Sequence, residues 1–281
     1  KVMTNFIPVR VAVRDLYNGE PNEGMRSIRT ILDRFSKFIE CSFFDVRQNN
    51  EVPDLGYDIY ISSGGPGCPL PAGEAWEEPF YALWDKLIEH NAIAENKKKY
   101  AFLICHSFQM MAHHLGFGIV SERHSPSFGI FPIHKTEDGN NDRIIGRLPE
   151  PFFAVDSREW QVTTPDIDKI VRSGGKLLCL EKIRPHVPYE RAIMGLRFSD
   201  EILGVQFHPE ADAEGMYRYF DRADKKEKII EHYGSEKYYD MIESLSDPNK
   251  IELTHHAIIP CFLADAIEHL NPQLRMQKAT V

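Results

Sequence analysis

A cysteine at the end of an apolar run is the first residue of this chain whose setting suits chemistry. Cys105 follows the apolar residues 100–104 and leads directly into Phe108, Met111 and Leu115, which recur at helical spacing. A chain that turns from strand to helix within about two residues forms a nucleophile elbow, which pushes the corner side chain out above the sheet. A helix N-terminus also favours the reactive thiolate. The pattern predicts a nucleophilic cysteine, with a small buried core residue as the alternative.

A histidine and a glutamate two positions apart follow another predicted strand. Residues 202–207 have the composition of a strand, and His208, Pro209 and Glu210 come directly after it. Side chains two apart on extended backbone point to the same side, so His208 and Glu210 can lie together. A carboxylate beside an imidazole fixes its tautomer and stabilises the imidazolium, as a Cys–His pair requires. The alternative is a plain loop at the end of a strand.

A glycine-rich loop follows a third predicted strand, residues 58–62. Its sequence is Gly64-Gly65-Pro66-Gly67. Glycines let backbone N–H groups approach a ligand closely, so such a loop can supply an oxyanion donor or hold an anion. The alternative is an ordinary tight turn. The loop lacks the lysine and the Ser/Thr of a phosphate-binding P-loop, so binding of a nucleoside triphosphate is not expected.

These three features must be brought together by the fold. The first part of the chain alternates strand and helix patterns, which predicts an α/β protein with an open, mostly parallel, flavodoxin-like sheet and helices on both faces. Ligands bind beyond the carboxyl ends of the strands in such sheets, so the three features are expected to share one cleft. The strands are predicted over 6–13, 41–46, 58–62 and 100–104, and the helices over 25–35 and 74–95.

The later part of the chain has a different pattern. Short strand-like runs separated by polar turns predict an antiparallel or mixed continuation of the sheet, over 118–120, 128–134, 152–155, 176–180 and 192–198. Charged helical patterns follow from residue 212, and a last helix over 255–270 is expected to be interrupted near Pro260. We therefore predict two parts, an enzyme-like domain over 1–211 and a helical extension over 212–281 that packs on it and adds no catalytic group.

Composition narrows the choice of partners and compartment. The 281 residues include 33 basic and 42 acidic side chains, a net charge of -9, which argues against a nucleic acid or an anionic membrane as the main partner. No apolar run reaches the roughly 18 residues of a membrane span. Five cysteines at irregular spacing do not form a disulfide framework, which favours a reducing, cytoplasmic setting. The histidines show no metal-ligand spacing, so neither a metal nor another cofactor is expected.

The combination of motifs resembles the class I glutamine amidotransferases, which use a Cys-His-Glu triad. The likeness covers residues 6–211 and rests on the loop 62–67, on Cys105 with Gln109, and on the run 204–210. It implies that Cys105 attacks the side-chain amide carbon of glutamine, that His208 acts as base and then as acid, and that Glu210 orients His208. Ammonia would leave first, and water would then hydrolyse a glutamyl thioester.

The same resemblance implies the remaining site residues and the partner. The backbone N–H groups of Gly65 and His106 would hold the oxyanion. The substrate would be glutamine or a related γ-glutamyl amide, and the ammonia would pass to a separate synthase subunit; a homodimer is a further expectation. The substrate wall would be formed by Gly64, Gly67, Gln109, Ser157 and Arg158.

The chain departs from the family pattern at three places. Leu103 and Ser107 stand where the elbow usually has glycines, which leaves open a catalytically inactive binding or regulatory subunit. The pair Ser157-Arg158 stands where many members have Ser-His. With the runs 113–116 and 128–131, this pair gives a weaker likeness to homoserine O-succinyltransferases, so acyl transfer to a homoserine-like hydroxyl is the other alternative.

Overall fold

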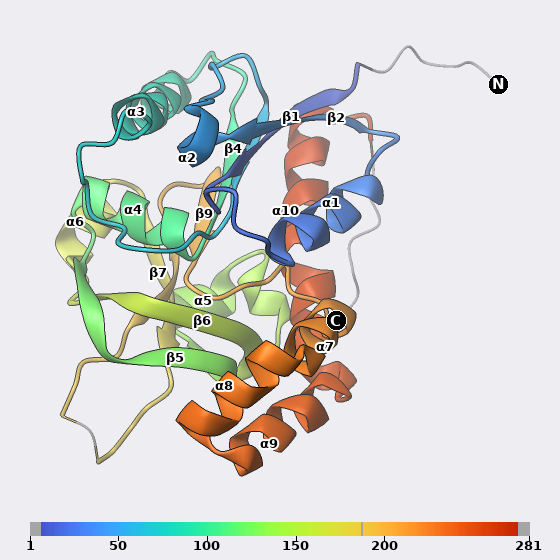
Figure 1. Cartoon of the computed structure of the whole chain (residues 1–281). Helices are drawn as coiled ribbons and strands as arrows, with labels where there is room; N and C mark the ends of the chain where they lie inside the picture. Colours follow the sequence, from blue (N-terminus) through green and yellow to red (C-terminus); the bar gives the residue numbers. More distant parts are fainter. Residues whose placement is uncertain (1–6, 187, 275–281) are drawn as a thin grey trace.

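A single nine-stranded sheet forms the centre of the molecule in the computed structural model, which describes residues 7–186 and 188–274 (Figure 1). The strand order is β2-β1-β3-β4-β9-β8-β7-β5-β6. Residue 6 of the first predicted strand and residues 275–281 of the predicted extension lie outside the described residues. The strands are β1 Val9–Asp15, β2 Ile39–Asp45, β3 Ile59–Ser62, β4 Tyr100–Ile104, β5 Ile119–Lys135, β6 Phe152–Thr163, β7 Lys176–Glu181, β8 Ile193–Arg197 and β9 Ile202–Val205.

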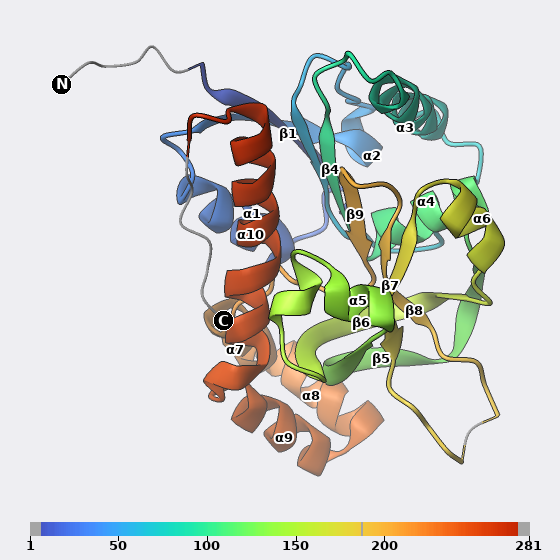
Figure 2. The same cartoon turned by 180° about the vertical axis from the view of Figure 1, so that it is seen from behind.

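Helices cover both faces of the parallel half of the sheet, as the alternation of its strand residues requires. Helices α1 and α10 pack on one face and α3 and α4 on the other, each face with its own buried apolar cluster (Figures 1 and 2). The helices are α1 Gly24–Asp33, α2 Val46–Asn49, α3 Glu77–Ala92, α4 His106–Leu115, α5 Glu137–Asn141, α6 Ile167–Arg172, α7 Ala213–Asp221, α8 Ala223–Tyr233, α9 Ser235–Leu245 and α10 Leu253–Leu270.

The predicted α/β class is confirmed, but the sheet is parallel over only half of its width. Strands β2, β1, β3, β4 and β9 run parallel, and β9, β8, β7, β5 and β6 pair antiparallel. Parallel neighbours need a long crossover, whereas the segments between β5 and β9 hold only short helices. Strands β3, β4 and β9 are parallel neighbours, so the three predicted motifs leave the sheet at the same edge.

Two antiparallel strands are longer than predicted from the sequence. The runs predicted at 118–120 and 128–134 belong to one strand, β5, and the run predicted at 152–155 extends to Thr163 as β6. Each strand provides the other's hydrogen-bond partners, with a register shift between Glu122 and Ser127. This extension matters because residues 155–160 of β6 reach the motifs at the sheet edge.

The last helices pack on the rest of the chain. Helices α7, α8 and α9 share a small apolar cluster with Val155 of β6, and α10 contributes to the main cluster on one face of the sheet. The predicted interruption at Pro260 is wrong, because α10 continues through it. Nearly every residue from Ala257 to Ile267 is buried, and this packing outweighs the hydrogen bond that proline cannot make. Among the described residues, no helix is long and apolar enough to cross a membrane.

Candidate active site

Cys105 occupies a strained corner between β4 and α4. Its backbone has φ 48° and ψ -98°, a conformation that residues other than glycine rarely adopt. Such strain is retained where the surrounding structure holds the residue firmly, often at functional sites. The side chain is only 5% exposed, yet it lines a cavity at the edge of the sheet. The predicted elbow geometry is therefore present, with the thiol at the N-terminus of α4.

The two departures from the family pattern fit this corner. The Ser107 hydroxyl accepts a hydrogen bond from the Ile104 N–H at 3.0 Å and lies 3.0 Å from the Ser62 carbonyl, to which it can donate. Leu103 pairs in register with Gly204 of β9. A Cβ at Gly204 would lie 3.5 Å from the Leu103 Cβ, within ordinary contact distance, so the missing side chain leaves room for leucine. Leu103 and Ser107 therefore do not distort the elbow.

His208 and Glu210 form a buried pair directly beyond β9. The His208 Nδ1 lies 2.8 Å from a carboxylate oxygen of Glu210, so Nδ1 donates and Nε2 is left for another partner. The backbone N–H of His208 donates to the Val155 carbonyl at 2.8 Å, which connects this segment to β6. The Glu210 carbonyl accepts a hydrogen bond from Nδ1 of His255 at 3.0 Å. Helix α10 therefore helps to position the pair through His255.

His208 and Cys105 meet beside Gly64. A Cβ built on Gly64 would lie 3.0 Å from the His208 Cε1 and 3.6 Å from the Cys105 Cβ. The imidazole and the thiol therefore both lie next to Gly64. Burial disfavours the charged imidazole, but the charges of Glu210 and Cys105 and the hydrogen bonds to both raise the pKa of His208 well above its ordinary value. The arrangement favours an imidazolium beside the Cys105 sulfur.

The absence of a side chain at Gly64 is needed for this geometry. In Gly64→Ala the new methyl group would press on the His208 ring and on the Tyr17 hydroxyl, which lies 3.3 Å from the built Cβ. A displacement of a few tenths of an ångström should lower kcat for amide hydrolysis roughly tenfold. Gly56→Ala is the matched control, because a Cβ there meets only the movable side chains of Asp54 and Arg10. Equal kcat values in Gly64→Ala and Gly56→Ala would show that the active site does not need the absence of a side chain at Gly64.

The glycine loop is fixed against the segment that follows β1. A Cβ at Gly65 would lie 2.4 Å from the Leu16 carbonyl oxygen, so only glycine fits there. Gly67 has φ 86°, and Arg47 of α2 donates to the Pro66 carbonyl at 2.7 Å. Gly65 and Gly67 line the cavity, whereas Gly64 lies beside the triad and is not among the lining residues.

His106 is the first residue of α4. Its N–H belongs to the first turn, whose N–H groups have no acceptor inside the helix. Burial, with the charge of Arg47, lowers the pKa of the His106 imidazole to about 3, so that side chain is neutral near pH 7. The oxyanion role of the Gly65 and His106 N–H groups stays a prediction.

A chain of amide groups connects Gln109 to the thiol. The Gln109 amide nitrogen donates to the Trp160 carbonyl at 2.9 Å and to the side-chain oxygen of Gln206 at 3.0 Å. The Gln206 amide nitrogen in turn lies 3.4 Å from the Cys105 sulfur. Gln206 is fully buried, and its residue type alone did not mark it as functional. Its place in the run before His208 was the only available signal.

Gln206 is expected to support the thiolate. In Gln206→Leu the donor to the sulfur is lost, and Gln109 loses one acceptor. A hydrogen bond to a charged group contributes about 1.5–3 kcal/mol, so alkylation of Cys105 by iodoacetamide at pH 7 should slow about tenfold. Gln273→Leu, at an exposed position, is the matched control and should leave the alkylation rate unchanged. An unchanged alkylation rate in Gln206→Leu would show that Gln206 does not support the thiolate.

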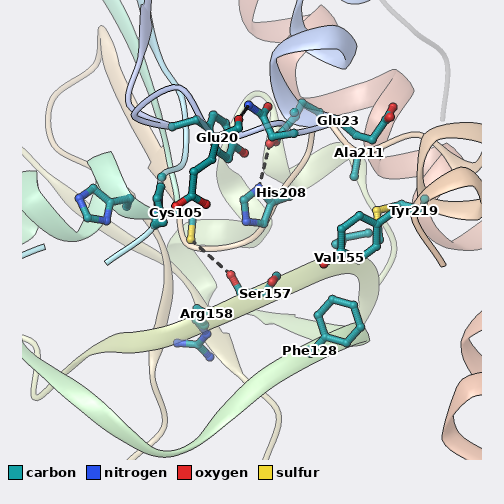
Figure 3. A pocket seen from close by; sticks show the side chains of 18 of the residues that line it. Glu20, Glu23, Cys105, Phe128, Val155, Ser157, Arg158, His208, Ala211 and Tyr219 are labelled. Carbon is teal, nitrogen blue, oxygen red and sulfur yellow. Dashed lines mark hydrogen bonds and ion pairs between the residues drawn. The ribbon is translucent and has the colours of Figure 1, made fainter. Parts of the chain in front are cut away.

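Ser157 and Arg158 have different settings on β6. The Ser157 carbonyl lies 3.8 Å from the Cys105 sulfur (Figure 3). The buried Arg158 guanidinium binds Asp156 at 3.0 Å and Glu181 at 3.4 Å, and it points away from Cys105 in Figure 3. Consecutive residues of a strand face opposite sides, which explains the difference. The geometry favours Arg158 as an anchor of β6, and its predicted contact with substrate stays a prediction.

The site opens into a cavity of about 680 Å³. Nine of the ten predicted site residues line it, Gly64 being the exception. Several other lining residues had no signal in the sequence, because they come from the loop after β1, from β5 and from helices α7 and α8. They include Tyr17, Glu20, Phe128, Met216, Tyr219 and Tyr233.

Tyr17 is another residue beside the triad that the sequence did not reveal. Burial, and then the negative charges of Glu210 and Cys105, raise its pKa well above the ordinary value, so it is a neutral hydrogen-bond donor. In the described part of the chain, no three His, Cys, Asp or Glu side chains are grouped so as to hold a metal ion. The site therefore contains a thiol, an imidazole, a carboxylate and backbone N–H groups. These are the groups that acyl transfer through a covalent thioester requires.

The sheet, the elbow and the Cys, His and Glu side chains at its edge bring together the groups that a cysteine nucleophile requires. The model of the family described as glutamine amidotransferase class-I matches residues 27–220. This chain belongs to that family. Membership supports glutamine amide hydrolysis in broad terms. A search of curated proteins gives no significant match.

Solved structures share the fold at low sequence identity. A glutamine amidotransferase from Thermotoga maritima aligns with a TM-score of 0.64 and 17% identity over 92% of this chain and 98% of its own. A putative GMP synthase component from Thermoplasma acidophilum gives 0.51 and 18% over 81% and 99%. The CTPS glutaminase domain of Trypanosoma brucei with bound acivicin gives 0.53 and 14% over 72% and 86%.

Proposed function

We propose that this protein hydrolyses the side-chain amide of glutamine, or of a related γ-glutamyl amide, through a thioester on Cys105. The observation that carries the proposal is the placement of Cys105 and His208 on either side of Gly64, with Glu210 bonded to His208 at 2.8 Å. The imidazolium beside the sulfur holds the proton that the leaving nitrogen needs.

The proposed reaction has two steps. The Cys105 sulfur bonds to the amide carbon, the oxyanion accepts hydrogen bonds from Gly65 and His106 N–H, and the nitrogen leaves as ammonia with the proton of His208. His208 then takes a proton from water, which attacks the thioester and releases glutamate and the thiolate. Glu210 holds the imidazole throughout. Gln109 is proposed to act at the substrate wall, together with Gly64, Gly67, Ser157 and Arg158.

The proposed setting includes a recipient for ammonia. The similar structures include a putative GMP synthase component and a CTPS glutaminase domain, which supports ammonia transfer to a separate synthase subunit. We further propose that residues 1–211 act as the catalytic domain and 212–281 as a helical extension on it. Among the described residues the five cysteines form no disulfide bond, which supports a reducing compartment such as the cytoplasm.

Two measurements test this proposal together. Purified protein should release ammonia and glutamate from glutamine in equal amounts. Acivicin, which is bound in the Trypanosoma brucei domain, should stop this release. The peptide that holds Cys105 should then carry acivicin less HCl, because the sulfur displaces chloride. Ammonia release that continues after Cys105 is fully modified would reject the mechanism. The absence of both turnover and modification would reject the proposed function.

A further inference from the structure

The cavity is larger than the proposed substrate requires. Glutamine has about ten non-hydrogen atoms, whereas cavities of about 300–1,000 Å³ hold drug-sized ligands. The volume here is about 680 Å³, and Cys105 occupies one end of it. Figure 3 shows Phe128 and Tyr219 at the far side, with His208 between them and Cys105. The cavity therefore has space beyond His208 that glutamine would not fill.

The far side of the cavity is apolar and aromatic. We call it the aromatic wall, and it is formed by Phe128, Val155, Met216, Tyr219 and Tyr233. The ring centroids of Phe128 and Tyr219 are 6.2 Å apart, and those of Phe128 and Tyr233 are 6.3 Å apart with planes inclined by 27°. Strands β5 and β6 and helices α7 and α8 supply these residues. The wall is thus built from packed elements.

The chemistry of the reaction decides which part of a substrate meets this wall. Nδ1 of His208 is bonded to Glu210 at 2.8 Å, so Nε2 must deliver the proton to the leaving nitrogen. The leaving nitrogen therefore lies on the His208 side of the thiol. The backbone N–H of His208 donates to the Val155 carbonyl at 2.8 Å, so the wall begins directly next to the histidine. A substituent on that nitrogen would extend onto the wall.

The charges near the wall indicate the kind of substituent. Glu23 lies 2.5 Å from Arg26 and 3.2 Å from Arg218, and Asp212 lies 2.6 Å from Arg26. Glu23 and Asp212 are therefore paired with arginines, and none of the residues that form the aromatic wall is charged. Rings and a thioether side chain favour a planar, uncharged group, because aromatic pairs and sulfur–ring contacts add to the burial of apolar area.

We propose that the aromatic wall is the binding site for the amine part of N-substituted γ-glutamyl amides whose substituent is apolar or aromatic. This inference rests on the proposed function and names its substrate class. The Cys105 sulfur bonds to the carbonyl carbon of the side-chain amide, and the C–N bond breaks with its electron pair on nitrogen. The nitrogen takes the proton of His208 and leaves as a primary amine, and water then hydrolyses the thioester to glutamate.

The test compares γ-glutamyl benzylamide with γ-glutamyl methylamide. Benzylamine is a weaker base than methylamine, so the change in the kcat/KM ratio on substitution of Phe128, and not the ratio alone, is the decisive result. The wild-type kcat/KM should be about tenfold or more higher for the benzylamide. Phe128→Ala should reduce this ratio to about threefold or less, and Phe128→Leu, which disturbs packing less, should reduce it in part. Phe131→Ala is the matched control on β5, because Phe131 does not line the cavity, and it should keep the wild-type ratio.

The outcomes separate the two proposals. Hydrolysis of glutamine with equal kcat/KM for both amides would overturn the wall as an amine site and leave the proposed function standing. A preference that persists in Phe128→Ala would also overturn it. If neither glutamine nor an amide is hydrolysed, the proposed function fails. Calorimetry with Cys105→Ala then decides about the wall, because the benzylamide should still bind about tenfold more tightly than the methylamide, and equal affinities would reject it.

Discussion

Cys105→Ala should lose at least about a thousandfold in kcat for ammonia release from glutamine. Removal of the nucleophile of a catalytic triad leaves only the contributions of binding and of the oxyanion donors, so a large loss is expected. The fold should survive, because the side chain is small and alanine keeps its Cβ. Circular dichroism and ammonia release measured on the same preparation provide the check.

Cys68→Ala is the matched control for this variant. Cys68 is exposed and follows the glycine loop by one residue, but it does not line the cavity. Its replacement should leave kcat unchanged. A folded Cys105→Ala protein with more than about a tenth of the wild-type kcat would show that another group performs the attack.

His208→Asn should lower kcat/KM for glutamine by about a thousandfold and slow the alkylation of Cys105 at pH 7 by at least about tenfold. Both effects arise because asparagine can neither transfer the proton nor provide the positive charge beside the sulfur. His113→Asn, at an exposed position of α4, should change neither rate. Alkylation that is equally fast in both variants would show that the imidazole does not stabilise the thiolate.

The raised pKa of His208 also predicts how stability depends on pH. A base whose pKa is raised in the folded state, as that of His208 is, stabilises the fold fully below its unfolded pKa, about 6.5. That stabilisation is lost as the pH rises through the raised pKa. The difference in unfolding free energy between wild type and His208→Asn should therefore be larger at pH 6 than at alkaline pH. Urea unfolding at both pH values measures it.

Spacing along the chain was sufficient to predict the parallel half of the sheet. Strands and helices alternate there, and each strand has a continuous apolar run, so β1, β3 and β4 were predicted to within a few residues. The long strand β5 was not, because Pro126, Gly129 and Pro132 interrupt its pattern and only pairing with β6 makes it extended. Helix α10 continues through Pro260 because tertiary packing outweighs local propensity.

The candidate site also has one part that the sequence predicted and another part that only the fold reveals. Cys105, His208 and the glycine loop were recognisable because each ends a strand, and their meeting follows from the parallel order β3-β4-β9. The aromatic wall gave no local signal, because Phe128 and Tyr219 are distant in sequence and become neighbours through the packing of α7 on β5 and β6. The setting of Arg158 depends on which side of β6 it faces, which residue type alone does not reveal.

The most direct test of the proposed chemistry is a mass measurement on the protein during turnover. After mixing with glutamine and rapid acid quenching, the peptide that contains Cys105 should carry one glutamyl group as a thioester, and the peptides of the other four cysteines should carry none. Glu210→Gln, which weakens the orientation of His208, should change the amount of this adduct but not its position. Steady ammonia release with the glutamyl group on another residue, or with no covalent adduct at any quench time, would contradict the central claim.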